Sequence, residues 1–178
     1  MTHKNIVAAN LIVVGVVCIV FLIVWACFVV GAHAEIKIDP ASLYSVTNVV
    51  DGDTFKVKVQ ENIITIRMLG VNTPETVDPR KPVECYGKEA SNQTKALLKD
   101  QKVRLTFNPN REMKDKYGRY LAYVYRGDGL FINESLVQDG YAREYTYGTP
   151  YSFQSVFRAD EKVAKKEKKG LWSACVNK

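Results

Sequence analysis

Side chains that could cleave a phosphate ester occur in three short clusters along the chain. Two aspartates flank a glycine at 51–53, a second cluster runs from Arg67 to Glu75, and a third runs from Asp115 to Arg119. Hydrolysis of a phosphodiester requires cationic groups on the non-bridging oxygens and an activated water molecule. Each cluster alone is weak evidence, because turns and solvated strand ends have a similar composition. Together, the three clusters predict a phosphodiester site.

The residue types suit distinct roles in such a site. Arginine binds phosphate well, because its planar guanidinium donates two parallel hydrogen bonds and remains charged. Arg67 and Arg119 could therefore clamp one phosphate, while Glu75 could orient or deprotonate a water molecule. Asp53 could hold a hard cation through its carboxylate oxygens. The sequence has no histidine after position 33, which excludes a histidine-based catalytic triad from the charged part of the chain.

Short strands must position these clusters. Alternating apolar and polar residues predict strands at 42–50, 55–59, 64–69, 103–107 and 120–125. The clusters fall at turns or strand ends, and the third strand should break at Thr73-Pro74, because proline cannot donate to a ladder. Helices are expected at 86–100, after Asn133 and after Ser152, with the last two residues as N-caps. These elements predict a mixed α+β fold, a five-stranded OB-fold β-barrel with three helices.

The N-terminal part of the chain has a different composition. Residues 6–34 contain no Asp, Glu, Lys or Arg, and about 20 apolar residues suffice for a helix that crosses a bilayer. The length favours an uncleaved membrane anchor, and the alternative is a signal peptide cut near Ala34, because Ala32-His33-Ala34 has the small-x-small form. Lys4 precedes the segment with no acid beside it, so in either case the remainder should be exported.

The 178 residues therefore divide into an N-terminal anchor or signal peptide at 1–34, a linker at 35–42 and one domain at 43–178. The net charge of +6 favours polyanionic or anionic-surface partners, although solubility alone explains a similar excess. We expect a monomer.

Two cysteines lie in the part of the chain that should be exported. Cys85 and Cys175 form an even count there, which in an oxidising compartment predicts one disulfide. The alternative is a metal-binding pair, which the lack of an accompanying histidine disfavours. The two other cysteines, Cys18 and Cys27, lie in the apolar segment.

From Val50 to Trp172 the chain resembles the staphylococcal nuclease, or thermonuclease, family. The resemblance rests on the runs Val50-Asp51-Gly52-Asp53-Thr54, Arg67 to Thr76, Tyr86-Gly87-Lys88-Glu89-Ala90-Ser91, Asp115-Lys116-Tyr117-Gly118-Arg119, Leu121-Ala122-Tyr123 and Gly170-Leu171-Trp172. It implies an OB-fold barrel with three helices. It also implies a Ca²⁺-dependent nuclease that cleaves DNA and RNA and leaves 3′-phosphate ends.

The resemblance also implies three groups of site residues and a supporting role for Asp51 beside the metal. They are catalytic Arg67, Glu75 and Arg119; calcium-binding Asp53, Asn72 and Thr73; and substrate-binding Lys116, Tyr117, Tyr145 and Tyr147. The chain departs from the family at Asn72, where the staphylococcal enzyme has an aspartate, so we expect weaker calcium binding. The alternative function is a non-catalytic nucleic-acid-binding module tethered at the membrane. The presence of all three catalytic side chains favours the enzyme.

Overall fold

The computed structural model describes residues 16–21 and 36–176 of the chain. From Lys37 onward the chain forms one compact unit. Most of the N-terminal segment predicted as an anchor or signal peptide lies outside the described residues. Within this segment the structure describes only residues 16–21, which are helical. Within the described ranges, no helix has the length and apolar character needed to cross a membrane.

Within residues 36–176, five strands close into a barrel in the order β1-β2-β3-β6-β5. They are β1 (Tyr44–Asp51), β2 (Thr54–Val59), β3 (Asn62–Met68), β5 (Lys102–Thr106) and β6 (Tyr120–Arg126). The chain first forms an antiparallel meander, and β3 then pairs in parallel with β6. The pairing of Tyr44 with Val103 closes the barrel between β1 and β5. The predicted five-stranded barrel is confirmed.

The barrel interior follows from the alternation of side chains along β2 and β3. Phe55 and Val57 of β2 and Ile66 of β3 are fully buried, and each such side chain contributes about 1.5–3 kcal/mol by leaving water. The intervening residues Lys56 and Thr65 point to the outside, where they face each other across the two strands. The period of two therefore gives the hairpin an apolar inner face and a polar outer face.

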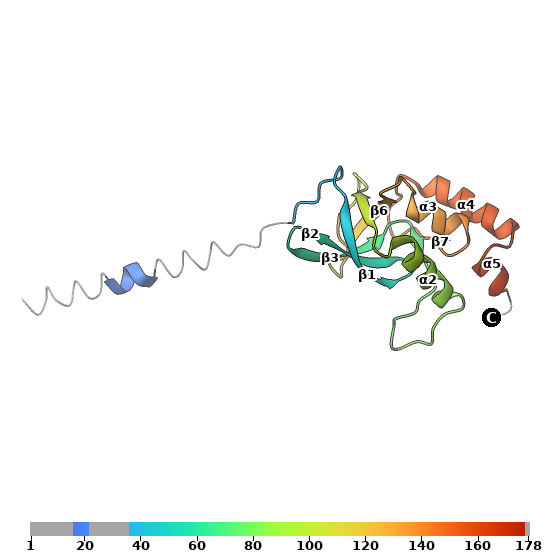
Figure 1. Cartoon of the computed structure of the whole chain (residues 1–178), viewed down its shortest axis with the longest axis horizontal. Coiled ribbons are helices and arrows are strands. Elements are labelled where there is room, and N and C mark those ends of the chain that lie inside the picture. The colour runs from blue at the N-terminus through green and yellow to red at the C-terminus, as the bar shows by residue number, and fades with distance from the viewer. Residues whose placement is uncertain (1–15, 22–35, 177–178) are drawn as a thin grey trace, which may run out of the picture. The chain divides into compact units, whose positions relative to one another are not determined.

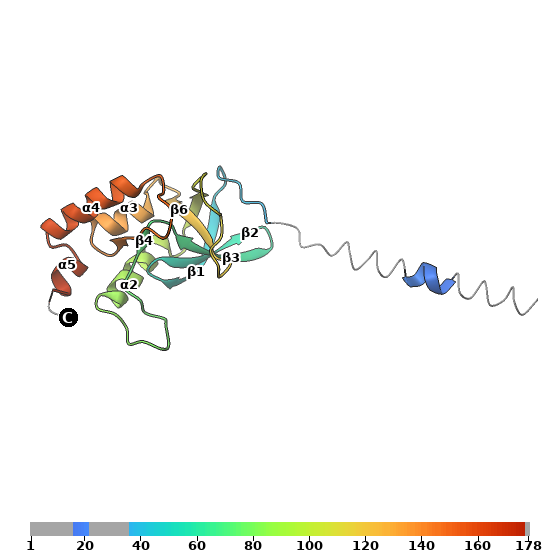
Figure 2. The same cartoon turned by 180° about the vertical axis from the view of Figure 1, so that it is seen from behind.

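Helices cover part of the barrel. The described part of the chain contains α2 (Gly87–Leu98), α3 (Ile132–Gln138), α4 (Gln154–Lys166) and the short α5 (Leu171–Ala174). Both views show α3 and α4 side by side, with α2 as a separate element near β1 (Figure 1, Figure 2). The three predicted helices are present, and α5 is an additional turn beyond Gly170.

The two predicted helix caps are wrong. Asn133 lies inside α3, fully buried, where its side chain accepts a hydrogen bond from the Val124 N–H at 2.9 Å and donates to the Leu69 carbonyl at 2.9 Å. It therefore joins the helix to the barrel. The Ser152 hydroxyl instead donates to Asn108 at 2.7 Å, and α4 begins after Phe153 without a side-chain cap. In both cases a tertiary partner takes the polar group that a cap would have used.

A small second sheet joins two loops beside the barrel. It pairs β4 (Val71–Asn72) with β7 (Arg143–Glu144) in antiparallel orientation. None of the predicted strands covers residues 141–147, but β7 and the hydrogen bond from the Tyr145 N–H to the Gly70 carbonyl at 2.9 Å hold them against the end of β3. Gly70 has φ of 82° and lies against the Tyr151 ring, so no other residue suits this position.

Candidate active site

One cleft of about 1280 Å³ gathers the charged clusters of the sequence. It lies at the β1–β2 turn, the exit of β3, the loop before β6 and the loop after β7. It is lined by Asp51 and by all ten residues predicted to catalyse or to bind metal and substrate, namely Asp53, Arg67, Asn72, Thr73, Glu75, Lys116, Tyr117, Arg119, Tyr145 and Tyr147. Residues that are spread along the sequence from Asp51 to Tyr147 thus line one cleft.

The register of β2 and β3 brings Arg67 to Asp53. Thr54 pairs with Arg67 across the hairpin, and the Arg67 guanidinium then reaches Asp53 Oδ2 at 3.0 Å. Both side chains are largely buried, at 12% and 9% exposed. The Thr73 N–H donates to the same Asp53 oxygen at 3.0 Å. These bonds satisfy a buried charge pair and fix the aspartate at the base of the cleft.

Arg67 is held from several sides before any ligand binds. One terminal nitrogen donates to the carbonyls of Met68 and Val71 at 2.7 Å each, and the other donates to Asn72 Oδ1 at 3.0 Å as well as contacting Asp53. Protein oxygens therefore occupy both terminal nitrogens of the guanidinium. Two parallel bonds to a phosphate, from Nε and the second terminal nitrogen, therefore require that nitrogen to release one of its contacts, to Asp53 or to Asn72.

The residues expected to bind calcium supply only oxygen atoms, as this hard cation prefers. They are the Asp53 carboxylate, the Asn72 amide oxygen and the Thr73 carbonyl, which lie close together at the exit of β3. The Thr73 hydroxyl is buried and has no hydrogen-bond partner within the described residues. In the same ranges, no group of three His, Cys, Asp or Glu side chains is placed to hold a metal. The oxygen set fits calcium by its chemistry but carries a single charge.

Asp51 supports the loop that follows β4. Its carboxylate accepts hydrogen bonds from the Gly52 N–H at 2.8 Å and from the Thr76 hydroxyl at 2.6 Å. Burial raises the pKa of Asp51 despite these donors. The side chain therefore connects the β1–β2 turn to the segment that carries Glu75.

Glu75 remains readily ionised in the cleft. Partial burial opposes its charge, but hydrogen bonds from the N–H groups of Val77, Thr76 and Asp78 outweigh burial and lower its pKa. One carboxylate oxygen accepts all three main-chain donors, at 2.6–3.2 Å. An ionised carboxylate fixed in this way can accept a proton from water or orient it.

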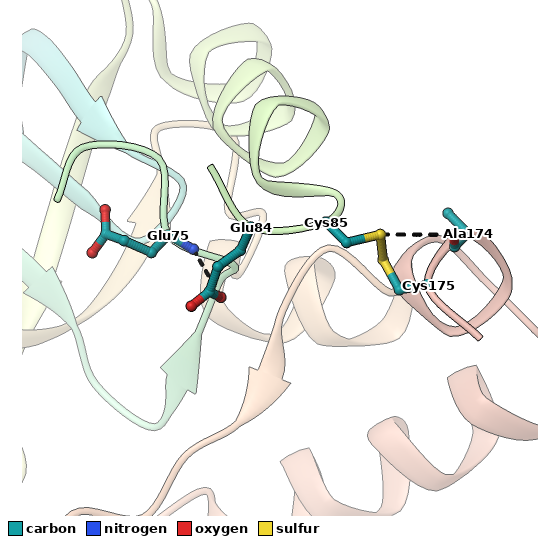
Figure 3. The surroundings of a disulfide bond; sticks show 5 residues. All are labelled: Glu75, Glu84, Cys85, Ala174 and Cys175. Atoms are coloured by element: carbon teal, nitrogen blue, oxygen red, sulfur yellow. Dashed lines mark hydrogen bonds between the residues drawn. A yellow bond between two sulfur atoms is a disulfide. The ribbon is translucent and has the colours of Figure 1, made fainter. Parts of the chain in front are cut away.

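The loop that carries Glu75 is closed at its neck, as Figure 3 shows. The Glu84 N–H donates to the Glu75 carbonyl at 2.9 Å, and the Glu75 N–H donates to the Glu84 carboxylate at 3.2 Å. The next residue, Cys85, forms the predicted disulfide with Cys175. The carboxylate of Glu75 points away from Glu84 (Figure 3), and Glu75 lines the cleft. Sequence reasoning missed Glu84, because an isolated glutamate in a polar loop gives no signal.

Arg119 is oriented by a partner in its own turn. Its Nε donates to Asp115 Oδ2 at 2.7 Å, and its main-chain N–H donates to Asp115 Oδ1 at 3.0 Å. The guanidinium lies 5.4 Å from the centre of the Tyr117 ring, and Lys116 lies 5.0 Å from the same ring. Asp115 was recognised only as part of a cluster, and the structure gives it this orienting contact.

Two exposed aromatic rings also line the cleft. Tyr145 and Tyr147 stack with ring centres 6.4 Å apart and planes 23° apart. Arg111 supports their loop, because its guanidinium donates to the carbonyls of Tyr147 and Thr149. Stacked rings of this kind accept the face of a nucleic-acid base. Arg111 also escaped sequence reasoning, because it lies in a loop without periodicity.

The fold and site together define an OB-type barrel with a cleft suited to a phosphate-bearing polymer. The family model described as "Staphylococcal nuclease homologue" matches residues 65–174. The chain is 47% identical over 130 residues to the thermonuclease of Staphylococcus hyicus, which covers 73% of this chain and 75% of that protein. It therefore belongs to the staphylococcal nuclease family.

Two further relatives have similar coverage of this chain. The thermonuclease of Staphylococcus intermedius is 43% identical over 129 residues, or 72% of this chain and 75% of that protein. Endonuclease YncB of Bacillus subtilis (strain 168) is 42% identical over 125 residues, or 70% of this chain and 58% of that protein.

Proposed function

We propose that this chain is a hydrolytic nuclease that cleaves phosphodiester bonds of DNA and RNA with Ca²⁺ and leaves 3′-phosphate ends. The observation that carries the proposal is the convergence of Asp53, Arg67, Glu75 and Arg119 on one cleft. The printed names of the relatives, thermonuclease and endonuclease, support the same class of reaction. A phosphodiesterase needs these group types and does not need a histidine.

Each catalytic side chain has a role that its surroundings support. Glu75 orients the attacking water and accepts its proton, since its pKa is lowered and its main-chain donors fix it. Arg67 and Arg119 donate to the non-bridging oxygens, where negative charge grows as the water oxygen adds to phosphorus. The bond between phosphorus and the 5′-oxygen then breaks, this oxygen takes up a proton from solvent water, and Glu75 releases its proton to solvent. The phosphate stays on the 3′ side.

Calcium binding is assigned to Asp53, Asn72 and the Thr73 carbonyl. The bound ion supplies Lewis-acid polarisation of the phosphate oxygens. Asn72 contributes a neutral oxygen, so we expect weaker calcium binding than a second carboxylate would give. Asp51 supports this region through its hydrogen bonds to Gly52 and Thr76.

Substrate binding is assigned to two pairs of residues. Lys116 and Tyr117 lie beside Arg119 and suit a neighbouring phosphate, while the stacked Tyr145 and Tyr147 suit a base. These contacts read no base edge, so the cleavage should tolerate most sequences.

The protein acts outside the cytoplasm in this proposal. The Cys85–Cys175 disulfide is stable only in an oxidising compartment, and the apolar residues 6–34 suit an exported chain that is anchored in the membrane or released near Ala34. We propose that it acts as a monomer.

Digestion of plasmid DNA and of RNA tests the proposal. Calcium should support cleavage and a chelator should abolish it. Glu75→Gln and Arg67→Ala should each lower the cleavage rate by about 10²–10³-fold. Lys58→Gln, an exposed change outside the cleft, should leave the cleavage rate unchanged. Full activity of both site variants would refute the assignment. Binding of nucleic acid without cleavage by the unaltered protein would instead support the non-catalytic binding module.

A further inference from the structure

A basic ledge continues the cleft beyond the residues that the catalytic proposal uses. Lys56 of β2, Thr65 of β3 and Lys114 of the loop before β6 all line the same cleft. None of them has a role in the proposed reaction. Lys56 and Thr65 are directly opposed on the outer face of the β2–β3 hairpin, and Thr65 lies one residue before the Ile66–Tyr120 pair that joins β3 to β6.

The register connects this ledge to the proposed phosphate site. Thr54 and Arg67 form the cross-strand pair two residues along from Lys56 and Thr65, on the same face of the hairpin. Two residues of a strand advance about 6.8 Å, which equals the rise of about two stacked nucleotides. A nucleic-acid strand that is bound with one phosphate at Arg67 can therefore reach Lys56 without leaving the protein surface.

Lys114 is held in place on the other side of the ledge. Its segment forms a bridge with Tyr120, and the Leu121 N–H donates to the Met113 carbonyl at 2.8 Å. The Lys114 ammonium lies 4.5 Å from the centre of the Tyr120 ring. The backbone contacts fix the main-chain position of Lys114, and its exposed side chain remains free to bind a ligand.

The charges of the two ledge lysines are not neutralised by neighbouring carboxylates. Within residues 16–21 and 36–176, neither Lys56 nor Lys114 forms an ion pair, although Glu112 also lines the cleft. Lys58, the next outward lysine of β2, pairs with Glu61 at 3.4 Å and does not line the cleft. Lys56 and Lys114 thus carry positive charge without an ion-pair partner in the described residues, beside the proposed site.

We propose that Lys56, Thr65 and Lys114 form a subsite for the phosphate backbone of the nucleic-acid strand that flanks the cleaved bond. This subsite deepens the proposed function and rests on it. The two ammonium groups bind phosphates as point charges, and the Thr65 hydroxyl donates to a phosphate oxygen between them. The contacts are independent of base identity, so the subsite makes the protein favour long chains over dinucleotides without selecting a sequence.

Binding of labelled oligothymidylates of two and ten nucleotides to the full chain tests the subsite. The Glu75→Gln protein in calcium serves as the background, and fluorescence anisotropy is measured over a range of salt concentrations. Each single-strand phosphate contact contributes about 0.7 to the slope of log affinity against log salt. Lys56→Gln should therefore lower the slope for the ten-nucleotide strand by about 0.7, which corresponds to about fivefold weaker binding at 0.1 M salt.

The matched control is Lys58→Gln, which makes the same charge change two residues further along the same strand. It should alter the ten-nucleotide affinity by less than about twofold. Lys56→Gln combined with Lys114→Gln should lower the slope by about 1.4. The urea midpoints of all variants should match, since both side chains point away from the core.

Two results would overturn the subsite. Equal weakening by Lys56→Gln and Lys58→Gln would mean that only net charge matters, and equal weakening for two and ten nucleotides would place Lys56 at the scissile phosphate. Because the readout is binding, it is separate from the proposed reaction. Failure of the unaltered protein to cleave nucleic acid would refute the reaction and leave the length dependence of binding to be judged by itself.

Discussion

Loss of the Cys85–Cys175 disulfide should remove a large share of the domain's stability. The two cysteines are separated by 90 positions. The loop-entropy relation gives about 4.6 kcal/mol at 25 °C for a closed loop of that length, mostly because the unfolded chain has fewer conformations. Domains of this size unfold with a free energy of about 5–15 kcal/mol. The disulfide therefore contributes about a third of the free energy of unfolding if the total is about 15 kcal/mol, and most of it if the total is about 5 kcal/mol.

Urea unfolding followed by circular dichroism measures this effect. With a slope of about 2 kcal/mol per molar urea, Cys85→Ser combined with Cys175→Ser should lower the midpoint by about 2 M. Cys18→Ser is the control, because Cys18 is a free cysteine and its replacement removes a thiol without opening a loop. It should leave the midpoint unchanged.

The same double variant should also have lower activity while it is still folded, in the absence of urea. Cys85 adjoins Glu84, whose carboxylate holds the main chain of Glu75. Release of this neck displaces Glu75 but leaves the substrate contacts in place, so kcat should fall more than KM rises. A midpoint shift below about 0.5 M, or an equal shift in Cys18→Ser, would refute the reasoning about the loop.

Three further outcomes follow from single side chains. Asn72→Asp should tighten calcium binding by at least about tenfold, because it adds a carboxylate; a calcium titration of activity with an unchanged midpoint contradicts this. Asn133→Ala should lower the free energy of unfolding in urea by about 2–4 kcal/mol, because it leaves the buried Val124 N–H and Leu69 carbonyl without their hydrogen-bond partner. A change below about 0.5 kcal/mol contradicts this. Burial, together with donation to Glu144, raises the pKa of Tyr151 above 10.0. Folding therefore favours the protonated phenol, so its contribution is present below about pH 10 and is lost as the pH rises. Tyr151→Phe should flatten the alkaline decline of the urea midpoint, and an unchanged decline would contradict the assignment.

The barrel could be predicted from the sequence because each strand buries one face. The alternation of Phe55 and Val57 with Lys56 reports that burial directly. The two-residue strands of the β4–β7 sheet are too short to show a period, so no strand was predicted over residues 141–147. The caps failed for a different reason: Asn133 and Ser152 have the composition of N-caps, but each is used by a tertiary partner that is far away in sequence.

The site residues were predicted from motifs, and the residues that hold them were not. Asp53, Arg67 and Arg119 stand in recognisable runs, so their approximate grouping followed from the resemblance. Glu84 and Arg111 act through main-chain atoms of their neighbours, and such contacts place no demand on the local sequence pattern. Their roles depend on how loops fold back, which periodicity does not encode.

The closed neck between Glu75 and Glu84 makes the intervening loop a suitable place for inserted peptides. The ends of this loop are tied to each other and its middle is exposed, so added residues extend into solvent without separating those ends. Doubling the length of a flexible loop costs only about 0.6 kcal/mol. An epitope tag or a fluorophore-carrying segment placed between Lys81 and Pro82 would thus lie beside the cleft while Glu75 keeps its position, and would give a local reporter of polymer entry.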